Sequence, residues 1–177
     1  MEPADVLQQA RLLCTADQVD AALQQMARRI AADLGQRNPI VVAVMNGGAF
    51  TAVNLCRYFD FPYEFEYVHA TRYGTSTTGG KLQWRVRPAE KLAGRAVLLV
   101  DDVLDKGVTL AALHEELERI DARDVSTAVL ITKRVSDRTL TRPVEYSGIE
   151  IDDVYVFGCG MDYAGYWRGL PELYAIE

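Results

Sequence analysis

Apolar residues recur along the chain in two patterns, which predict surface helices that alternate with buried strands. Between residues 15 and 34 apolar side chains return every three or four positions, and Thr15 with Gln18 matches a capping box, which predicts a helix. Four branched apolar residues at 97–100 predict a strand that is buried on both faces, the apolar run at 40–45 predicts another buried strand, and residues 126–132 predict a further strand. Together these patterns predict an α/β fold in which a central parallel sheet is flanked by helices.

The residues that follow the run at 97–100 carry the clearest chemistry of the chain. They include, in order, Asp101, Asp102, Asp105, Gly107 and Thr109. Thr109 can cap a helix that begins near Leu110. Carboxylates at the end of a buried strand can accept hydrogen bonds from sugar hydroxyls, and a helix N-terminus favours a phosphate. The stretch therefore predicts a site for a ligand that carries both hydroxyl groups and a phosphate.

This stretch resembles the phosphoribosyl-pyrophosphate (PRPP) binding signature of the type I phosphoribosyltransferases, which is an apolar strand, two acids, two aliphatic residues and then Asp-x-Gly-x-Thr. The chain is similar to the hypoxanthine-guanine phosphoribosyltransferases in four ordered motifs over about residues 10–177. The resemblance implies one phosphoribosyltransferase domain over 1–177, with a core at about 36–150, a hood from the N-terminal segment and about 151–177, and a mobile flap hairpin at about 70–83.

The resemblance gives each residue of the signature a role. Asp105 would be the catalytic residue, acting as the general base or proton partner near purine N7. Asp101 and Asp102 would hold the ribose hydroxyls together with Mg²⁺. The 5′-phosphate and ribose would be bound by Asp101, Asp102, Lys106, Gly107, Val108 and Thr109. Lys106 departs from the family, which often has Thr or Ser there, so one hydroxyl contact is lost and a cation is gained.

The same resemblance implies pyrophosphate contacts and a flap. The pyrophosphate contacts would be Asn46, Gly47, Gly48 and Arg168. In the family an unusual non-proline cis peptide precedes the glycines, and here that bond is Met45–Asn46. Many relatives have Lys where Asn46 stands, so a charge contact is absent. The family's Ser-Tyr pair of the flap reads Arg72-Tyr73 here: Tyr73 matches, and Arg72 departs and is kept as a candidate phosphate contact.

A further set of residues resembles the purine-binding hood of the 6-oxopurine enzymes. Tyr155 would stack on the base, and Val156 would pair with it through its backbone. Lys133, after the strand at 126–132, would donate to the 6-oxo group and disfavour adenine. Met161 would line the base pocket, and Asp162 would support a second metal ion through a water.

The implied reaction is purine salvage: a pentosyl (glycosyl) transfer from PRPP to hypoxanthine or guanine, giving IMP or GMP and pyrophosphate. The sequence leaves a xanthine-preferring enzyme open, because the 2-position of the base is read largely by backbone groups. A pyrimidine-operon regulator with uracil phosphoribosyltransferase activity shares the signature, but Lys133 and Tyr155 count against it. Two further alternatives do not catalyse this reaction. A receiver-type signalling domain also has an acid pair after a strand, but it carries that pair near the N-terminus, whereas nearly a hundred residues precede it here. A protein that binds PRPP without turnover is the other alternative, and release of pyrophosphate would exclude it.

Composition limits the partners and the compartment. The net charge of −6 over 177 residues argues against binding to nucleic acid or to an anionic membrane. No secretory signal and no apolar window of transmembrane length is visible, so we expect a cytoplasmic protein. The cysteines lack the spacing of a structural zinc site and fit a reducing compartment. The expected partners are PRPP and a 6-oxopurine base, and the family resemblance suggests a homodimer or homotetramer.

Two residues outside these motifs have open interpretations. Cys159 lies between two glycines near the expected site, either as a reactive thiol or as a small buried side chain, and the second is preferred. His114 falls on the polar side of a helix predicted over about 110–120, where we expect it to be solvated.

Overall fold

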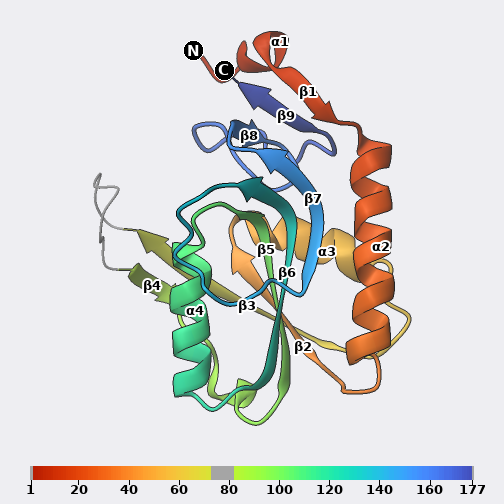
Figure 1. Ribbon diagram of the computed structural model, residues 1–177, viewed down its shortest axis with the longest axis vertical. Coiled ribbons are helices and arrows are strands. Elements are labelled where there is room, and N and C mark those ends of the chain that lie inside the picture. Colours follow the sequence, from red (N-terminus) through yellow and green to blue (C-terminus); the bar gives the residue numbers. More distant parts are fainter. Residues whose placement is uncertain (1, 73–81, 177) are drawn as a thin grey trace.

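The predicted apolar strands form the centre of the larger of two sheets in the computed structural model, which describes residues 2–72 and 82–176 (Figure 1). Five adjacent strands of this sheet run parallel to one another, and a sixth, β4, pairs antiparallel with β3 at one edge. The strands lie in the order β4 (Leu82–Val86), β3 (Glu64–Arg72), β2 (Ile40–Met45), β5 (Ala96–Leu104), β6 (Arg123–Arg134) and β7 (Tyr146–Asp152). The predicted α/β fold with a mostly parallel sheet is confirmed.

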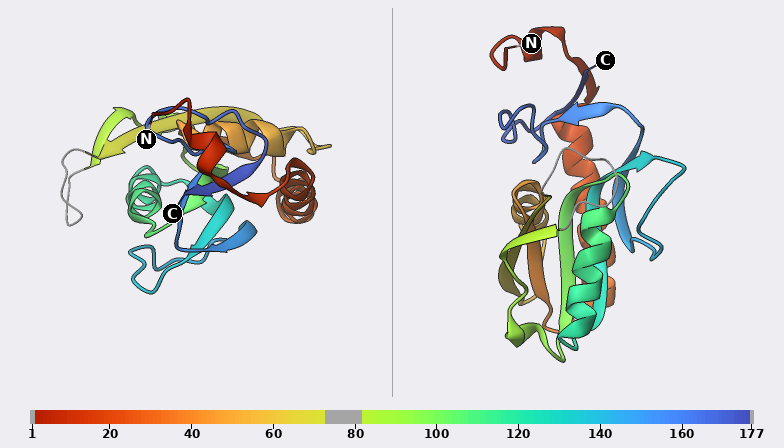
Figure 2. Two further views of the ribbon diagram at one scale, coloured as in Figure 1. Left: turned by 90° about the horizontal axis from the view of Figure 1, so that it is seen from above. Right: turned by 90° about the vertical axis from the view of Figure 1, so that its left-hand side faces the viewer.

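Helices cover both faces of this sheet, as the views in Figure 2 show. The helices are α2 (Ala16–Leu34) and α3 (Gly47–Cys56) on one face and α4 (Val108–Arg119) on the other. Side chains alternate along each strand: Val41 and Ala43 pack with α2 and α3, whereas Val42 and Val44 pack with α4. This alternation explains why the buried strands are apolar at every position.

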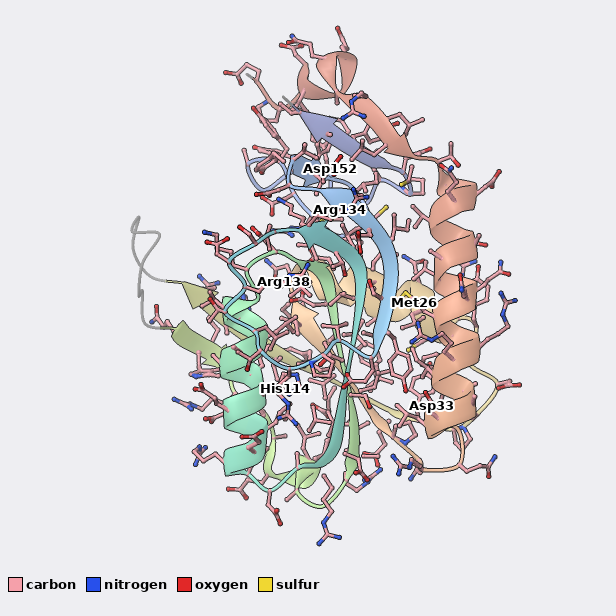
Figure 3. The ribbon with its side chains drawn as sticks, in the orientation of Figure 1. Met26, Asp33, His114, Arg134, Arg138 and Asp152 are labelled. Carbon is pink, nitrogen blue, oxygen red and sulfur yellow. The ribbon has the colours of Figure 1, made fainter. Side chains whose placement is uncertain are left out.

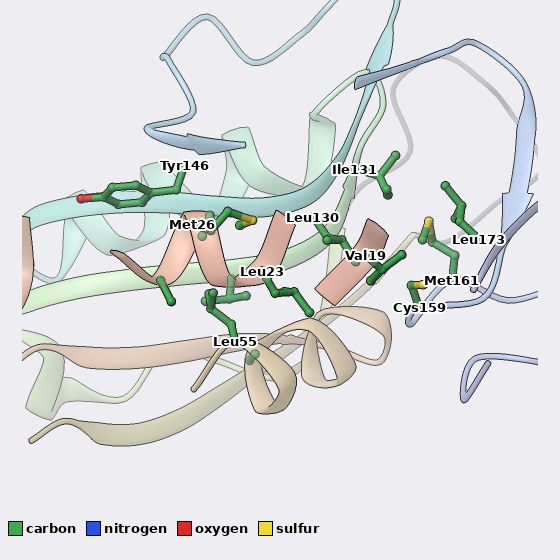
Figure 4. Close-up of a cluster of buried hydrophobic side chains, with 14 of the residues drawn as sticks. Val19, Leu23, Met26, Leu55, Leu130, Ile131, Tyr146, Cys159, Met161 and Leu173 are labelled. Atoms are coloured by element: carbon green, nitrogen blue, oxygen red, sulfur yellow. The ribbon is translucent and has the colours of Figure 1, made fainter. Parts of the chain in front are cut away.

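The core between α2 and the sheet follows the predicted helical spacing (Figure 4). The apolar face of α2 includes Val19, Leu23 and Met26, which are buried against side chains of α3, β6 and β7. The capping box at Thr15 and Gln18 is present, with the two reciprocal hydrogen bonds at 3.3 and 2.9 Å. The helix predicted over 15–34 is therefore confirmed, and its role is packing.

A small antiparallel sheet, which the apolar pattern did not predict, joins the two ends of the described chain. Its strands lie in the order β1 (Arg11–Cys14), β9 (Leu173–Ile176) and β8 (Tyr155–Phe157). Figure 1 shows this small sheet above the carboxyl ends of the large-sheet strands. The short helix α1 (Val6–Gln9) and the 3₁₀ turn η1 (Glu90–Leu92) complete the described elements.

The expectation that His114 is solvated was wrong. His114 is only 4% exposed, because the side of α4 that carries it faces β6, and its Nε2 lies 2.8 Å from Thr127 Oγ1 (Figure 3). Burial lowers the pKa of this imidazole. Within residues 2–72 and 82–176, no helix combines the length and the apolar character needed to cross a lipid bilayer.

Candidate active site

Strand β5 carries two adjacent carboxylates to the carboxyl end of the large sheet. Asp101 and Asp102 are each 9% exposed, so both are almost fully buried. The strand does not stop at these acids as the sequence suggested, because ladder pairing with β6 continues to Leu104. Burial raises the pKa of Asp101 well above its usual range, with a further contribution from the neighbouring Asp102 charge, and burial also raises the pKa of Asp102. The two side chains therefore place a buried pair of carboxyl groups at this end of the sheet.

The N-terminus of α4 follows the acids, but Thr109 is not its cap as predicted. Gly107 holds the N-cap position with a φ of +74°, and the helix begins at Val108, so Thr109 lies in the first turn. Glycine is favoured here because the left-handed conformation penalises a side chain. The amides of a first helical turn lack intrahelical acceptors, so they are available to an anion.

A cavity of about 270 Å³ connects the acids, this helix end and the loop after β2. It is lined by Val44, Met45, Asn46, Gly47, Ala70, Asp101, Asp102, Val103, Asp105, Gly107, Val108, Thr109, Leu110 and Arg168. We call it the acid cavity. Most residues predicted for the ribose, the 5′-phosphate and the pyrophosphate therefore line the same cavity. A larger cavity of about 480 Å³ between α2 and α3 shares only Arg168 with it.

The loop after β2 has the predicted cis peptide bond at Met45–Asn46. Helix α3 begins at Gly47, directly after this bond. A Cβ on Gly47 would lie 1.7 Å from Asp102 Oδ2, and one on Gly48 would lie 2.5 Å from the Val100 carbonyl oxygen. These glycines therefore let the loop approach β5 and its acids closely.

Gly160 is a site residue that the sequence reasoning missed. Its φ is +109°, and a Cβ there would lie 2.4 Å from the Gly47 carbonyl oxygen and 3.2 Å from Asp102 Cβ. The turn that carries Gly160 therefore packs directly on the loop after β2. The signal in the sequence is the pair Gly158 and Gly160, because closely spaced glycines indicate a tight turn.

Arg168 connects that turn to the acid cavity. Its guanidinium donates to the Gly160 carbonyl oxygen at 2.8 Å and lies 2.5 Å from Asp162 Oδ1. The positive charge of Arg168 acts to lower the pKa of Asp102, against the larger effect of burial. Asp162 Oδ2 accepts from the Gly165 amide at 2.7 Å, so both Asp162 oxygens have protein partners.

The residues predicted for the purine lie on β6 and the small sheet, away from the wall of the acid cavity. Lys133 is 13% exposed at its side chain, and its Nζ lies 3.4 Å from Asp153 Oδ1. Tyr155 is 51% exposed, and its hydroxyl donates to the Asp162 carbonyl oxygen at 2.8 Å. Val156 is buried in the core. An exposed aromatic ring can stack on a base, and a lysine ammonium can donate a hydrogen bond to one.

Met161 is 5% exposed and packs in the core with α2, so its side chain does not line the acid cavity. Arg72 ends β3, and Tyr73 lies outside the described residues. Cys159 is buried, its Sγ donates to the Pro171 carbonyl oxygen at 3.3 Å, and burial raises its pKa to about 12, which confirms a buried rather than a reactive thiol.

Comparison with known proteins identifies the fold and the family. Residues 15–164 match the family model described as "Phosphoribosyl transferase domain". The chain is 29% identical to a hypoxanthine-guanine phosphoribosyltransferase of Aquifex aeolicus, covering 94% of each chain, and 25% identical to a hypoxanthine-guanine-xanthine phosphoribosyltransferase of Tritrichomonas foetus, covering 91% of this chain and 88% of that one.

Solved structures agree with this family match. A hypoxanthine-guanine phosphoribosyltransferase from Bacillus anthracis superposes with a TM-score of 0.85 at 25% identity, covering 93% of this chain and 95% of that chain. A hypoxanthine phosphoribosyltransferase from Staphylococcus aureus has the same fold, with a TM-score of 0.89 at 20% identity and coverage of 97% and 94%. The family model covers most of the chain, and its signature residues meet at one cavity. The chain therefore belongs to the phosphoribosyltransferase family.

Proposed function

We propose that the protein transfers the 5-phosphoribosyl group from PRPP to hypoxanthine or guanine, giving IMP or GMP and pyrophosphate. The observation that carries the proposal is the acid cavity, where two buried acids, an exposed acid, a helix N-terminus and an arginine meet. Three of the relatives named above have both hypoxanthine and guanine in their names, which supports the choice of base.

The 5′-phosphate of PRPP would bind at the N-terminus of α4. The amides from Lys106 to Thr109 and the Thr109 hydroxyl surround the helix end, where the aligned peptide dipoles favour an anion. The pyrophosphate would bind at the opposite wall of the acid cavity, on Asn46 and Gly47, with Gly48 behind them. Arg168 would supply the positive charge there.

Asp101 and Asp102 would accept hydrogen bonds from the ribose hydroxyls and hold Mg²⁺. Among the described residues, no cluster of three or more His, Cys, Asp or Glu side chains is arranged as a metal site. The buried pair supplies two carboxylates, which fits Mg²⁺ because this ion is usually held by one or two carboxylates together with substrate oxygens and water. When bound, the ion would neutralise charge on the leaving pyrophosphate. Asp162 would support a second ion through a water.

Asp105 would exchange the proton at purine N7. It is exposed and lines the acid cavity, so a base above the ribose can reach it. An anionic carboxylate at this point also offsets positive charge that develops at the sugar as pyrophosphate leaves.

The base itself would be read by the small sheet and the end of β6. Tyr155 would stack on the ring, the Val156 backbone would pair with it, and Met161 would support this wall from the core. Lys133 would donate to the 6-oxo group and disfavour adenine, whose 6-amino group is itself a donor. In this proposal the small sheet is the hood, and Arg72 and Tyr73 belong to a flap at about 70–83 that closes over the reaction centre.

The proposed setting follows the family. We infer one phosphoribosyltransferase domain over 1–177, with a core at about 36–150 and a hood from the N-terminal segment and about 151–177. We also infer a cytoplasmic homodimer or homotetramer with PRPP and a 6-oxopurine as its partners, without nucleic acid or membrane.

Initial rates test the proposal. The protein is mixed with PRPP and Mg²⁺ and with hypoxanthine, guanine, xanthine or adenine in turn, and nucleotide and pyrophosphate are measured. We expect turnover with hypoxanthine or guanine and a rate about a hundredfold lower with adenine, because an unpaired buried polar group costs about 1–3 kcal/mol. Absence of nucleotide with every base contradicts the proposal.

A xanthine-preferring enzyme is the second candidate. It is favoured by the relative from Tritrichomonas foetus, whose name includes xanthine among its bases. The same assay separates the two candidates, because kcat/KM for xanthine would then exceed that for hypoxanthine and guanine.

A further inference from the structure

Lys106 lies in the phosphate loop, defined here as residues 104–109, but its side chain does not line the acid cavity. Its Nζ lies 2.8 Å from Asp137 Oδ2 instead. Asp137 belongs to residues 135–145, which connect β6 to β7 and which we call the bridging segment. The ammonium that replaces the family's hydroxyl is therefore paired with a carboxylate outside the signature.

Backbone contacts hold the bridging segment against the same loop. The Lys106 carbonyl oxygen accepts from the amides of Thr139 and Leu140, at 2.7 and 3.4 Å. Leu140 is 7% exposed and packs in the core beneath α4. A Cβ on Gly107 would lie 2.6 Å from Leu140 Cβ, so no space separates the two segments. The phosphate loop therefore rests on the bridging segment.

The bridging segment is also tethered at its start, beside the proposed base-binding lysine. The Arg138 guanidinium donates to the Lys133 carbonyl oxygen, which also accepts from the Val135 amide at 3.1 Å (Figure 3). An ion pair between two freely moving side chains gains little, because the cost of ordering them offsets the attraction. Here the backbone contacts already fix the two segments against each other, so pairing Lys106 with Asp137 orders only their two side chains.

We propose that Asp137 is a positioning residue for the phosphate loop, because its pairing with Lys106 holds the loop so that the amides of Gly107, Val108 and Thr109 face the acid cavity. Amides that are ordered before the ligand arrives bind an oxyanion more tightly, since less conformational entropy is lost on binding. The inference rests on the proposed function, which places the 5′-phosphate of PRPP at these amides.

Binding of ribose 5-phosphate to the full chain, followed by isothermal titration calorimetry, tests this role without needing turnover. Asp137→Asn is expected to raise the Kd about threefold, which is within the range measured for exposed ion pairs. Lys106→Met removes the other partner and should have a similar effect. The double variant should bind no more weakly than either single variant, because both substitutions remove one interaction. Asp137→Glu should restore the Kd to within about twofold of the original protein.

Asp124→Asn is the matched control. Asp124 is another exposed aspartate in an ion pair, 3.7 Å from Arg37, and it lies at the opposite end of β6. Its substitution should leave the ribose 5-phosphate Kd unchanged. An unchanged or lowered Kd in Asp137→Asn, or additive effects in the double variant, would overturn the positioning role.

Kinetics separate positioning from general destabilisation. In the purine assay, Asp137→Asn should raise KM for PRPP by the same factor as the Kd and change kcat much less, whereas an equal loss in kcat alone contradicts the inference. If no purine is turned over but Asp137→Asn still weakens ribose 5-phosphate binding, the proposed function fails and the positioning role stands. If the unsubstituted protein turns over PRPP but does not bind ribose 5-phosphate, the positioning role fails.

Discussion

Among the three acids of the signature, Asp105 is exposed and Asp101 and Asp102 are buried, and this difference separates their roles. Asp105→Asn keeps the size of the side chain and removes its ability to take a proton. We expect kcat to fall by about 10²–10⁴, the usual contribution of a general base, while the Kd for PRPP changes little. Steady-state rates and calorimetric PRPP binding check this. Comparable losses in PRPP binding and in turnover contradict the proton role of Asp105.

Asp101 should limit stability at neutral pH. Burial raises its folded-state pKa well above the unfolded value of about 3.9, so the folded protein retains a proton that the unfolded chain has released. The stabilising contribution of this carboxyl is complete below the unfolded pKa and is lost as the pH rises through the folded pKa. Asp101→Asn should therefore raise the free energy of unfolding at pH 7, and the gain should shrink as the pH falls toward 4.

Urea unfolding at a series of pH values measures this difference between Asp101→Asn and the original protein. Asp60→Asn, which makes the same change at an exposed position, serves as the control and should show no such trend. A gain that is equal at pH 4 and pH 7 contradicts the assignment to a buried charge. Turnover should fall in Asp101→Asn, because the proposed ribose and metal ligand is lost.

At the scale of elements, the site depends on one close contact between the loop after β2 and the turn after β8. Gly160→Ala places a Cβ 2.4 Å from the Gly47 carbonyl oxygen, so the two backbones must separate. We expect a loss of about 1–3 kcal/mol in unfolding free energy, typical of overpacking, together with reduced kcat/KM.

Gly165→Ala is the matched control for this contact. Gly165 also has a positive φ, +91°, but a Cβ there meets no atom within 4 Å. Both variants carry the strain of a left-handed alanine, so the difference between them measures the contact alone. Urea unfolding and steady-state kinetics measure the loss in unfolding free energy and in kcat/KM for each variant. If the two variants lose equal amounts, backbone strain and not the contact of the two loops causes the losses.

The sequence predicted the elements whose pattern is local and missed those that depend on distant partners. The buried strands and α2 were predictable, because burial on both faces or on one helical stripe dictates a periodic apolar pattern. Strand β7 and the small sheet were not, because β7 mixes apolar with polar positions and β1, β8 and β9 are only three or four residues long. The pairing of Lys106 with Asp137 was also missed, since no pattern in either segment indicates the other.

For the whole molecule, the described structure divides the proposed substrate sites between two sheets. The acid cavity lies at the carboxyl ends of large-sheet strands, whereas Tyr155 and Val156 belong to the small sheet. The small sheet is built from both ends of the chain, with β1 and β8 on either side of β9. The N-terminal segment supports it further, because Trp167 Nε1 donates to the Pro3 carbonyl oxygen at 2.6 Å.

A chain that begins at Arg11 should therefore weaken base recognition and spare PRPP binding. This truncation keeps β1 but removes α1, the fully buried Val6 and the acceptor for Trp167. Loss of a hydrogen bond worth about 1 kcal/mol predicts a rise of about fivefold in KM for the purine, with KM for PRPP within about twofold of the original value. Initial rates with each substrate varied in turn measure both constants.

Trp167→Phe in the full chain removes the same hydrogen bond and should also raise the purine KM. Equal rises in both KM values would mean that the two sheets act as one unit, because disturbing the small sheet would then disturb the acid cavity as well.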